Sequence, residues 1–414
     1  MKALHIADLH IGKSIHGISL VDSGDQEYWV DRFLEVVKAE EPEVVMIAGD
    51  VYDRANPSGE AAGLLDKLLS GIASMNIPIM MVSGNHDSGK KLEFLSGILA
   101  SRGIHIVGSL EKEIKPVVIN GKDGEDTYFW LVPYIFPALV ADKYDMEVAD
   151  YQEAMKAVIS RMDIDVTKRN VFIGHQNVTS NGTEVERGGS ESMVAGVGQI
   201  DYSVFDKFDY VALGHIHSGY HIGRKSVRYA GTPICYHFDE IRNGDKGPVI
   251  VELGSKKSGE CIVDTSVKGI KPLHPMVEYD EDYAVVLEKI QNELPVDSYV
   301  KVVLSDRRVT PETSSVIRDM LAKKNSRLLE INSSYKDTLR DVDIKSSEEI
   351  DDKSVGELFE DFFAERTGSN GLNDAQKIIY DIVEDYVPKE RDDRKKAIDD
   401  KVIEQLLEKI LKED

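Results

Sequence analysis

Five short motifs within the first 217 residues contain most of the side chains that could bind a pair of metal ions. In chain order they are Asp8-Leu9-His10, Gly49-Asp50-Val51-Tyr52-Asp53, Gly84-Asn85-His86-Asp87, Gly174-His175 and Gly214-His215-Ile216-His217. Aspartate and asparagine provide oxygen ligands, histidine provides nitrogen, and no cysteine occurs among them. This mixture suits Mn²⁺, Fe²⁺ or Zn²⁺ better than Ca²⁺, which prefers oxygen alone, or a structural zinc ion, which prefers cysteine.

Such a ligand set is typical of a binuclear site. Two divalent ions roughly 3.5–4 Å apart stabilise both the attacking and the leaving oxygen of an in-line displacement. A carboxylate must bridge them because two close dications repel each other, and Asp50, preceded by Gly49, is the best candidate bridge. Any one of these residues alone could equally be a strand-end cap, but the five motifs together favour a metal site.

Each motif directly follows a short apolar segment with the composition of a β-strand. These segments span residues 3–7, 44–48, 77–82, 171–173 and 210–213. In an open α/β sheet, ligands bind at the carboxyl ends of the strands, where the loops present their side chains. The sequence therefore predicts an α/β fold that gathers the motifs at one edge.

The motifs resemble those of the calcineurin-like metallophosphoesterase superfamily, whose pattern D-x-H, G-D-x-x-D, G-N-H-D, G-H and G-H-x-H is complete here. Residues 2–10, Arg54, Ser88 and the segment Tyr229-Ala230-Gly231-Thr232-Pro233 are further similar to the SbcD family of DNA exonuclease subunits. This resemblance covers residues 1 to about 270. Archaeal and eukaryotic repair nucleases of the same lineage usually carry histidine at the place of Asp53, so the chain resembles the bacterial branch.

The resemblance implies a role for each motif residue. One metal ion would be held by Asp8, His10, Asp50 and His217, and the second by Asp50, Asn85, His175 and His215. His86 would not be a ligand but would stabilise or protonate the leaving group. Asp53 lies one loop turn beyond Asp50 and could orient His86. The preferred metal would be Mn²⁺.

The resemblance also implies an architecture: a two-sheet sandwich flanked by helices, a small α/β capping domain and a helical C-terminal tail. We place the metallophosphoesterase domain at 1–270, the capping domain at 271–340, an acidic linker at 341–352 and the tail at 353–414. The pattern after residue 268 predicts strands at 277–278, 299–304 and 327–331, and helices at 283–294 and 311–324.

The tail carries apolar stripes at helical spacing, such as Leu358, Phe359, Phe362 and Phe363. Helices with narrow apolar faces usually dock on a partner or on one another. By resemblance, the tail would bind the coiled-coil base of an SbcC-type ATPase, in a heterotetramer containing two copies of this chain. A small self-packed appendage is the alternative.

Composition limits the function classes. The 414-residue chain has a net charge of −24, and residues 341–414 contain 12 basic and 23 acidic residues. Phosphate contacts need Lys and Arg, so DNA contacts would come from local patches, bound dications or a partner. Two cysteines fit a reducing cytoplasm. We expect no signal segment and no membrane span.

These observations lead to one function and two alternatives. The first expectation is a metal-dependent double-strand DNA nuclease, by resemblance a 3′-to-5′ exonuclease and hairpin endonuclease in DNA repair and recombination. A two-metal phosphodiesterase or phosphatase for small or protein substrates would share the site, but it explains neither the cap nor the tail. A scaffold that joins ATPase subunits would explain the tail, but it leaves the ligand set without a purpose.

Overall fold

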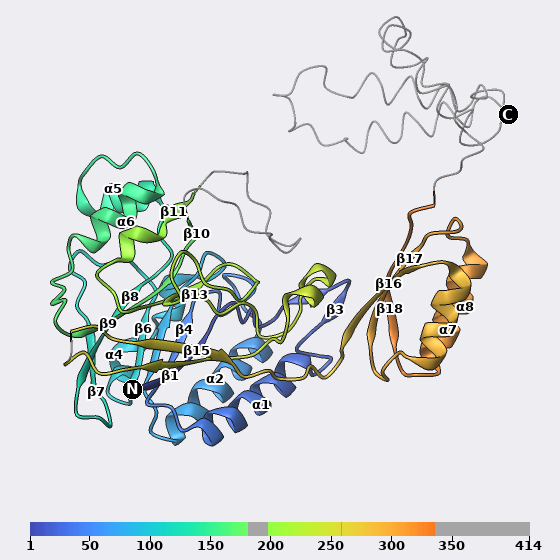
Figure 1. Cartoon of the computed structure of the whole chain (residues 1–414), viewed down its shortest axis with the longest axis horizontal. Helices are drawn as coiled ribbons and strands as arrows, with labels where there is room; N and C mark the ends of the chain where they lie inside the picture. Colours follow the sequence, from blue (N-terminus) through green and yellow to red (C-terminus); the bar gives the residue numbers. More distant parts are fainter. Residues whose placement is uncertain (181–197, 258, 336–414) are drawn as a thin grey trace, which may run out of the picture. The chain divides into compact units, whose positions relative to one another are not determined.

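The computed structural model describes residues 1–180, 198–257 and 259–335. The expected acidic linker and helical tail therefore lie outside the described residues. Two β-sheets carry the five motifs (Figure 1). The first has the strand order β15 (Val263–Val267), β14 (Val249–Leu253), β1 (Lys2–Ile6), β4 (Val44–Ala48), β5 (Ile79–Val82) and β6 (Ile104–Val107). The second has the order β13 (Val227–Tyr229), β12 (Tyr210–Gly214), β9 (Arg169–His175), β8 (Asp126–Val132) and β7 (Val117–Asn120).

The strands that precede the motifs run parallel to one another within each sheet. In the first sheet β1, β4, β5 and β6 run in parallel, whereas β14 and β15 are antiparallel additions at one edge. In the second sheet β8, β9, β12 and β13 are parallel, and β7 pairs antiparallel with β8. Two short antiparallel strands, β2 (Ser14–Ile15) and β3 (Ile18–Ser19), and the parallel pair β10 (Val178–Thr179) and β11 (Ile200–Asp201) lie in the loops.

Both faces of the strands that precede the motifs are buried, which explains why their sequences are continuously apolar rather than alternating. Along β4, Val44, Met46 and Ala48 face the second sheet, while Val45 and Ile47 face helices. The core between the sheets also includes side chains of the second sheet such as Phe129, Val171 and Ala212, all fully buried.

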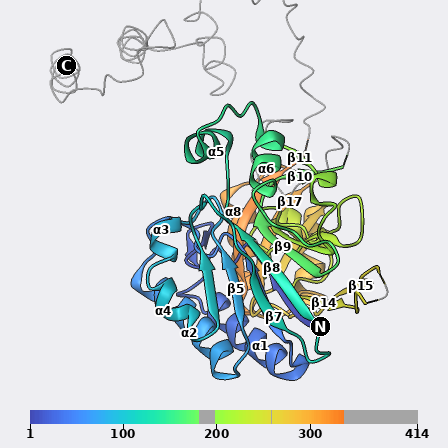
Figure 2. The same cartoon turned by 90° about the vertical axis from the view of Figure 1, so that its left-hand side faces the viewer.

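Helices cover the outer faces of both sheets (Figures 1 and 2). α1 (Asp25–Glu40) and α2 (Gly59–Ser74) pack against the first sheet through Trp29, Phe33, Leu65 and Leu68. α5 (Pro137–Tyr144) and α6 (Tyr151–Ile159) cover part of the second sheet. The remaining helical segments are short: α3 (Gly89–Leu92), α4 (Ser96–Ala100), η1 (Tyr202–Phe205) and η2 (Phe238–Asn243).

The segment after residue 275 forms a separate small sheet with its own core. β16 (Met276–Glu281), β17 (Tyr299–Leu304) and β18 (Arg327–Ser333) are parallel, and α7 (Tyr283–Asn292) and α8 (Pro311–Ala322) cover one face of the sheet. The start of α8 is a capping box, in which Thr310 and Thr313 each satisfy the backbone of the other. All five elements confirm the pattern predicted from the sequence, whereas the exact domain boundaries stay a prediction.

The structure confirms the expected α/β class, with two facing sheets flanked by helices. Within the residues that it describes, no helix is both long enough and apolar enough to span a membrane.

Candidate metal centre

All five motifs lie at or just beyond the carboxyl ends of parallel strands. Asp8 and His10 follow β1, Asp50 and Asp53 follow β4, and Asn85 and His86 follow β5. In the second sheet His175 is the last residue of β9, and His215 and His217 follow β12. The sandwich brings these ends together, so residues more than 200 positions apart meet: the His215 backbone N–H donates to Asp8 Oδ1 over 2.8 Å.

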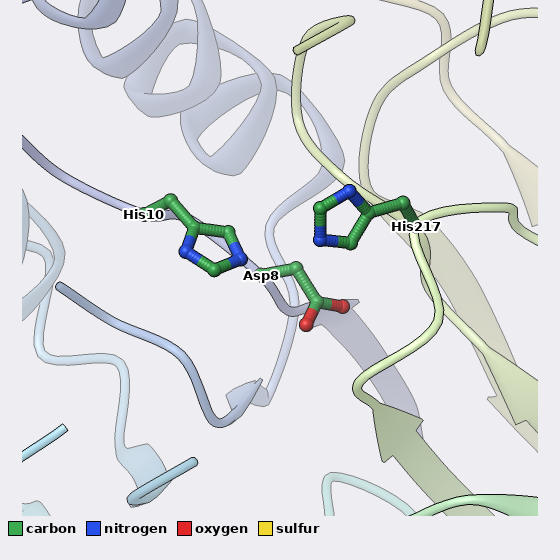
Figure 3. A group of neighbouring side chains, drawn as sticks. All are labelled: Asp8, His10 and His217. Carbon is green, nitrogen blue, oxygen red and sulfur yellow. The ribbon is translucent and has the colours of Figure 1, made fainter. Parts of the chain in front are cut away.

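The proposed first metal position consists of Asp8, His10, Asp50 and His217. Ligand atoms of Asp8, His10 and His217 all lie within 4.8 Å of one another (Figure 3). His10 Nε2 lies 3.6 Å from Asp50 Oδ2, which places the proposed bridging carboxylate beside this group.

The proposed second metal position consists of Asp50, Asn85, His175 and His215. Asn85 Oδ1 lies 3.1 Å from both His175 Nε2 and His215 Nδ1. His175 Nε2 is also 3.3 Å from Asp50 Oδ2. Asp50 Oδ2 therefore faces histidine nitrogens of both positions, while its Oδ1 accepts the His86 backbone N–H at 2.9 Å. This arrangement leaves Oδ2 free to face both proposed positions, as a bridge through one oxygen would.

Unpaired buried atoms indicate that these side chains fit a cation. Asp8 Oδ2 and His10 Nε2 are buried, and neither has a hydrogen-bond partner among the described residues. A buried polar group without a partner costs about 1–3 kcal/mol, and a divalent ion would satisfy both atoms. The harder oxygen and borderline nitrogen donors suit Mn²⁺, Fe²⁺ or Zn²⁺.

The backbone is strained at four of the seven proposed ligands. Asp8, His10, Asp50 and His215 have φ values of 53°, 40°, 46° and 100°, in a region that non-glycine residues seldom adopt. Such residues cost of order 1–3 kcal/mol each and persist where the surrounding structure holds them. Here the Asp8 and His10 N–H groups donate to the Gly49 and Asp50 carbonyls at 3.0 and 2.9 Å. The positive-φ backbone conformation directs these four side chains toward the common site.

Three motif glycines allow the ligands to approach each other. A Cβ at Gly49 would collide with the His175 ring, and one at Gly84 would collide with the Asp50 carboxylate. A Cβ at Gly214 would meet the Ala48 carbonyl oxygen and the His175 ring. The glycine before each of these three ligands is therefore needed for space, and at Gly49, with φ of 86°, also for conformation.

The charges of the site depend on one another. Burial raises the pKa of Asp8 to about 7 and lowers the pKa of His10 to about 4. Burial would also lower the pKa of His175, but the Asp50 and Asp8 carboxylates outweigh it and raise that pKa to about 9. For Asp50, burial is likewise outweighed, and His175 and His10 hold its pKa below the usual range. Asp8 and His175 therefore hold a proton more readily than usual, and His10 holds one less readily.

His86 lies at the exposed side of the site, and Asp53 contacts it as expected, but through its main chain and not its carboxylate. His86 Nδ1 donates to the main-chain carbonyl oxygen of Asp53 at 3.0 Å. The Asp53 carboxylate instead lies 3.0 Å from Lys13 Nζ and 3.5 Å from His10 Nδ1. The backbone of Asp53 therefore orients His86, and its side chain supports His10.

Asp87 caps the loop, accepting from the Gly84, Val51 and Tyr52 N–H groups.

Sequence reasoning missed Glu240, a fully buried carboxylate in η2. Its Oε1 lies 3.1 Å from His217 Nδ1, on the side of the ring away from the first metal position. It also missed Tyr134, whose half-buried ring has its centroid 6.3 Å from those of His175 and His215. In the sequence, Glu240 stands out only by its place eight residues after Thr232 of the segment Tyr229–Pro233. No spacing rule links a glutamate at that distance to a metal site.

Comparisons with known proteins agree with this geometry. The family model for calcineurin-like phosphoesterases matches residues 1–219, which include all seven proposed ligands. The chain therefore belongs to this class of metallophosphoesterases, and divalent metal ions are its expected cofactors.

A second family model, described as the type 5 capsule protein repressor C-terminal domain (SbcD_C), matches residues 272–367. Relatives include the SbcD subunit of nuclease SbcCD from Staphylococcus epidermidis, 30% identical over 293 residues, or 70% of this chain and 75% of the relative. The corresponding protein of Staphylococcus saprophyticus subsp. saprophyticus is 33% identical over 299 residues, with the same coverage. Within the phosphoesterases, the chain belongs to the SbcD family.

Proposed function

We propose that this chain is the nuclease subunit of an SbcCD-type complex, a two-metal enzyme that hydrolyses phosphodiester bonds in double-stranded DNA. The observation that carries the proposal is the convergence of seven ligand side chains from two sheets on one site, with Asp50 between the two metal positions. The relatives are named as SbcD subunits of the nuclease SbcCD, which supports the same class of substrate and partner. The activities we expect are 3′-to-5′ exonuclease on duplex ends and endonuclease at hairpins.

The side chains have separate tasks in this reaction. Two divalent ions would supply a nucleophile at neutral pH and neutralise charge on the phosphate, and Mn²⁺ is our proposed metal. His175 Nδ1 donates to the Ala48 carbonyl at 2.9 Å, which leaves Nε2 as the ligand atom. His86 donates Nδ1–H to the Asp53 carbonyl, which leaves Nε2 to face the substrate. In its imidazolium form, His86 would carry a second proton on Nε2 and could give it to the departing sugar oxygen.

Metal-free protein is expected to be inactive on duplex DNA, and Mn²⁺ is expected to restore cleavage better than Mg²⁺. Mg²⁺ prefers oxygen ligands and keeps several waters, so a site with four imidazoles serves it poorly. The test dialyses the chain against chelator, adds back each metal, and measures cleavage of end-labelled duplex DNA. Full activity in Mg²⁺ free of transition metals would contradict the ligand assignment.

The same assay distinguishes the alternatives when it is run with a small chromogenic phosphodiester, with and without a co-purifying ATPase. A nuclease cleaves duplex DNA and responds to the ATPase. A phosphodiesterase for small substrates cleaves only the chromogenic compound efficiently. A scaffold binds the ATPase and cleaves neither substrate at a useful rate.

An exposed apolar patch offers a surface for the second copy of this chain that the proposed heterotetramer contains. Phe94, Leu95 and Ile98, around the start of α4, are 72%, 50% and 67% exposed. Clustered exposed apolar side chains usually mark an interaction site, and we propose that this patch is the dimer interface. An SbcC-type ATPase, bound through residues 353–414, would complete a heterotetramer. The reducing cytoplasm is the compartment this assembly implies.

Replacing Phe94 and Ile98 together with Glu is expected to convert the dimer into single chains of 46.2 kDa. Two charges in an apolar interface would be desolvated without partners. Light scattering on the eluting peak measures the mass, and Val166→Glu, at a 54% exposed apolar position elsewhere, is the matched control. A double variant that keeps the wild-type mass shows that the patch is not the interface.

A further inference from the structure

Glu240 connects the ring of one metal ligand to a buried polar network. Its Oε1 lies 3.1 Å from His217 Nδ1, and neither residue is more than 6% exposed. Its Oε2 accepts from Thr232 Oγ1 at 2.9 Å, Lys246 Nζ at 3.0 Å and the Tyr236 N–H at 3.3 Å. Both carboxylate oxygens are therefore held in place.

The same network fixes the backbone of His217. Lys246 Nζ donates to the His217 carbonyl oxygen at 2.8 Å and to Thr232 Oγ1 at 2.6 Å. The Thr232 N–H donates to the same carbonyl at 3.0 Å. The main chain and the ring of His217 are thus positioned by residues that do not reach the metal positions themselves.

Both histidines of the first metal position differ from His175 of the second in what lies behind the ring. His217 and His10, at the first position, face the carboxylates of Glu240 and Asp53, each of which is paired with a lysine. His175, at the second position, faces the neutral carbonyl oxygen of Ala48. An anionic acceptor makes the imidazole a stronger ligand and fixes its tautomer, and removal of such a partner typically costs 10–100-fold in metal affinity.

We propose that Glu240 is a positioning residue that acts through His217 and makes the first metal position the tighter of the two. Its carboxylate keeps the proton on Nδ1 and directs the Nε2 lone pair toward the metal. Metal ions then bind in order, the first position before the second. This inference rests on the proposed ligand assignment.

The experiment titrates the metal-free full chain with Mn²⁺ alone by isothermal calorimetry. The wild type is expected to bind two ions with different affinities. Glu240→Gln keeps the shape but removes the charge, and it is expected to weaken the tighter site by about 10–100-fold while the weaker site stays unchanged. Glu240→Asp, which keeps the charge, is expected to recover part of the affinity. Asp239→Asn, at the exposed neighbouring residue, is the matched control.

Two further variants test whether Glu240 affects metal affinity through His217. Glu240→Gln leaves Lys246 without its anion, so the double variant E240Q/K246M removes the unpaired buried cation as well. It should weaken the tighter site at least as much as Glu240→Gln, because Lys246 also donates to the His217 carbonyl oxygen. In a His217→Asn background, Glu240→Gln should cause no additional loss, because residues acting through one contact are not additive.

The outcomes separate the inference from the proposed function. If the wild type binds two ions and Glu240→Gln leaves both affinities unchanged, or weakens both equally, the inference is wrong and the metal assignment stands. An additional loss in the His217→Asn background also overturns it, because Glu240 then acts by another route. If the wild type binds fewer than two ions, the ligand assignment itself fails.

Discussion

Replacing His86 with Gln is expected to lower the turnover of duplex DNA by about 10²–10⁴-fold while both metal ions stay bound. The His86 side chain is 44% exposed, and its Nε2 lies 4.0 Å from Asp50 Oδ2, at the open side of the site. Its Nδ1 donates to a backbone carbonyl, which can only accept, so a proton for the substrate would have to come from Nε2 of the imidazolium form. Single-turnover cleavage and Mn²⁺ stoichiometry on the same sample measure the two effects.

A matched change at His221, which is exposed and has no proposed role, controls for the loss of an imidazole. His221→Gln should leave both turnover and metal content unchanged. The side chains of His86, His10 and Asp50 also lie close enough together to hold a metal ion. A role of His86 as a metal ligand is therefore the alternative that the experiment tests. If His86→Gln loses one equivalent of metal, His86 is a ligand and not a proton donor.

The site could be predicted from the sequence because each motif encodes its own local geometry. A buried parallel strand is apolar on both faces, so the segments before the motifs were recognisable as strands, as β4 and β12 illustrate. Gly49, Gly84 and Gly214 stand next to ligands because a Cβ would collide with His175, Asp50 or Ala48. The same contacts that make the site possible therefore leave a pattern in the sequence.

The supporting contacts could not be predicted, because they depend on how loops from different strands pack. Glu240 follows β13, while the ring it contacts follows β12, and only the folded chain places them 3.1 Å apart. Asp53 shows the same limit. Its spacing from Asp50 indicated proximity to His86, but the turn presents its carbonyl to His86 and its carboxylate to His10. Sequence spacing identified Asp53 as a neighbour of His86, but not which Asp53 atom makes the contact.

A chain that ends at residue 340 is expected to keep hydrolysis of a short chromogenic phosphodiester and to lose ATP-dependent cutting of long duplex DNA. Residues 1–335 form one compact unit, which contains all seven ligands, His86, Glu240 and the small sheet of β16, β17 and β18. The truncated chain therefore keeps its chemistry. It loses the apolar stripes of residues 353–414, which we propose as the ATPase-binding segment.

The truncated chain should cleave long duplex DNA more slowly than the absence of ATP coupling alone would explain. Residues 1–340 carry a net charge of −13, since −11 of the chain's −24 lies beyond them, so they hold a polyanion poorly without a partner. Co-elution with the ATPase and cleavage with and without ATP measure both effects. Phe362→Asp with Phe363→Asp in the full chain should reproduce the truncation, because it places charges in one apolar stripe without changing length. A truncated chain that still co-elutes and responds to ATP would place the partner interface within residues 1–340.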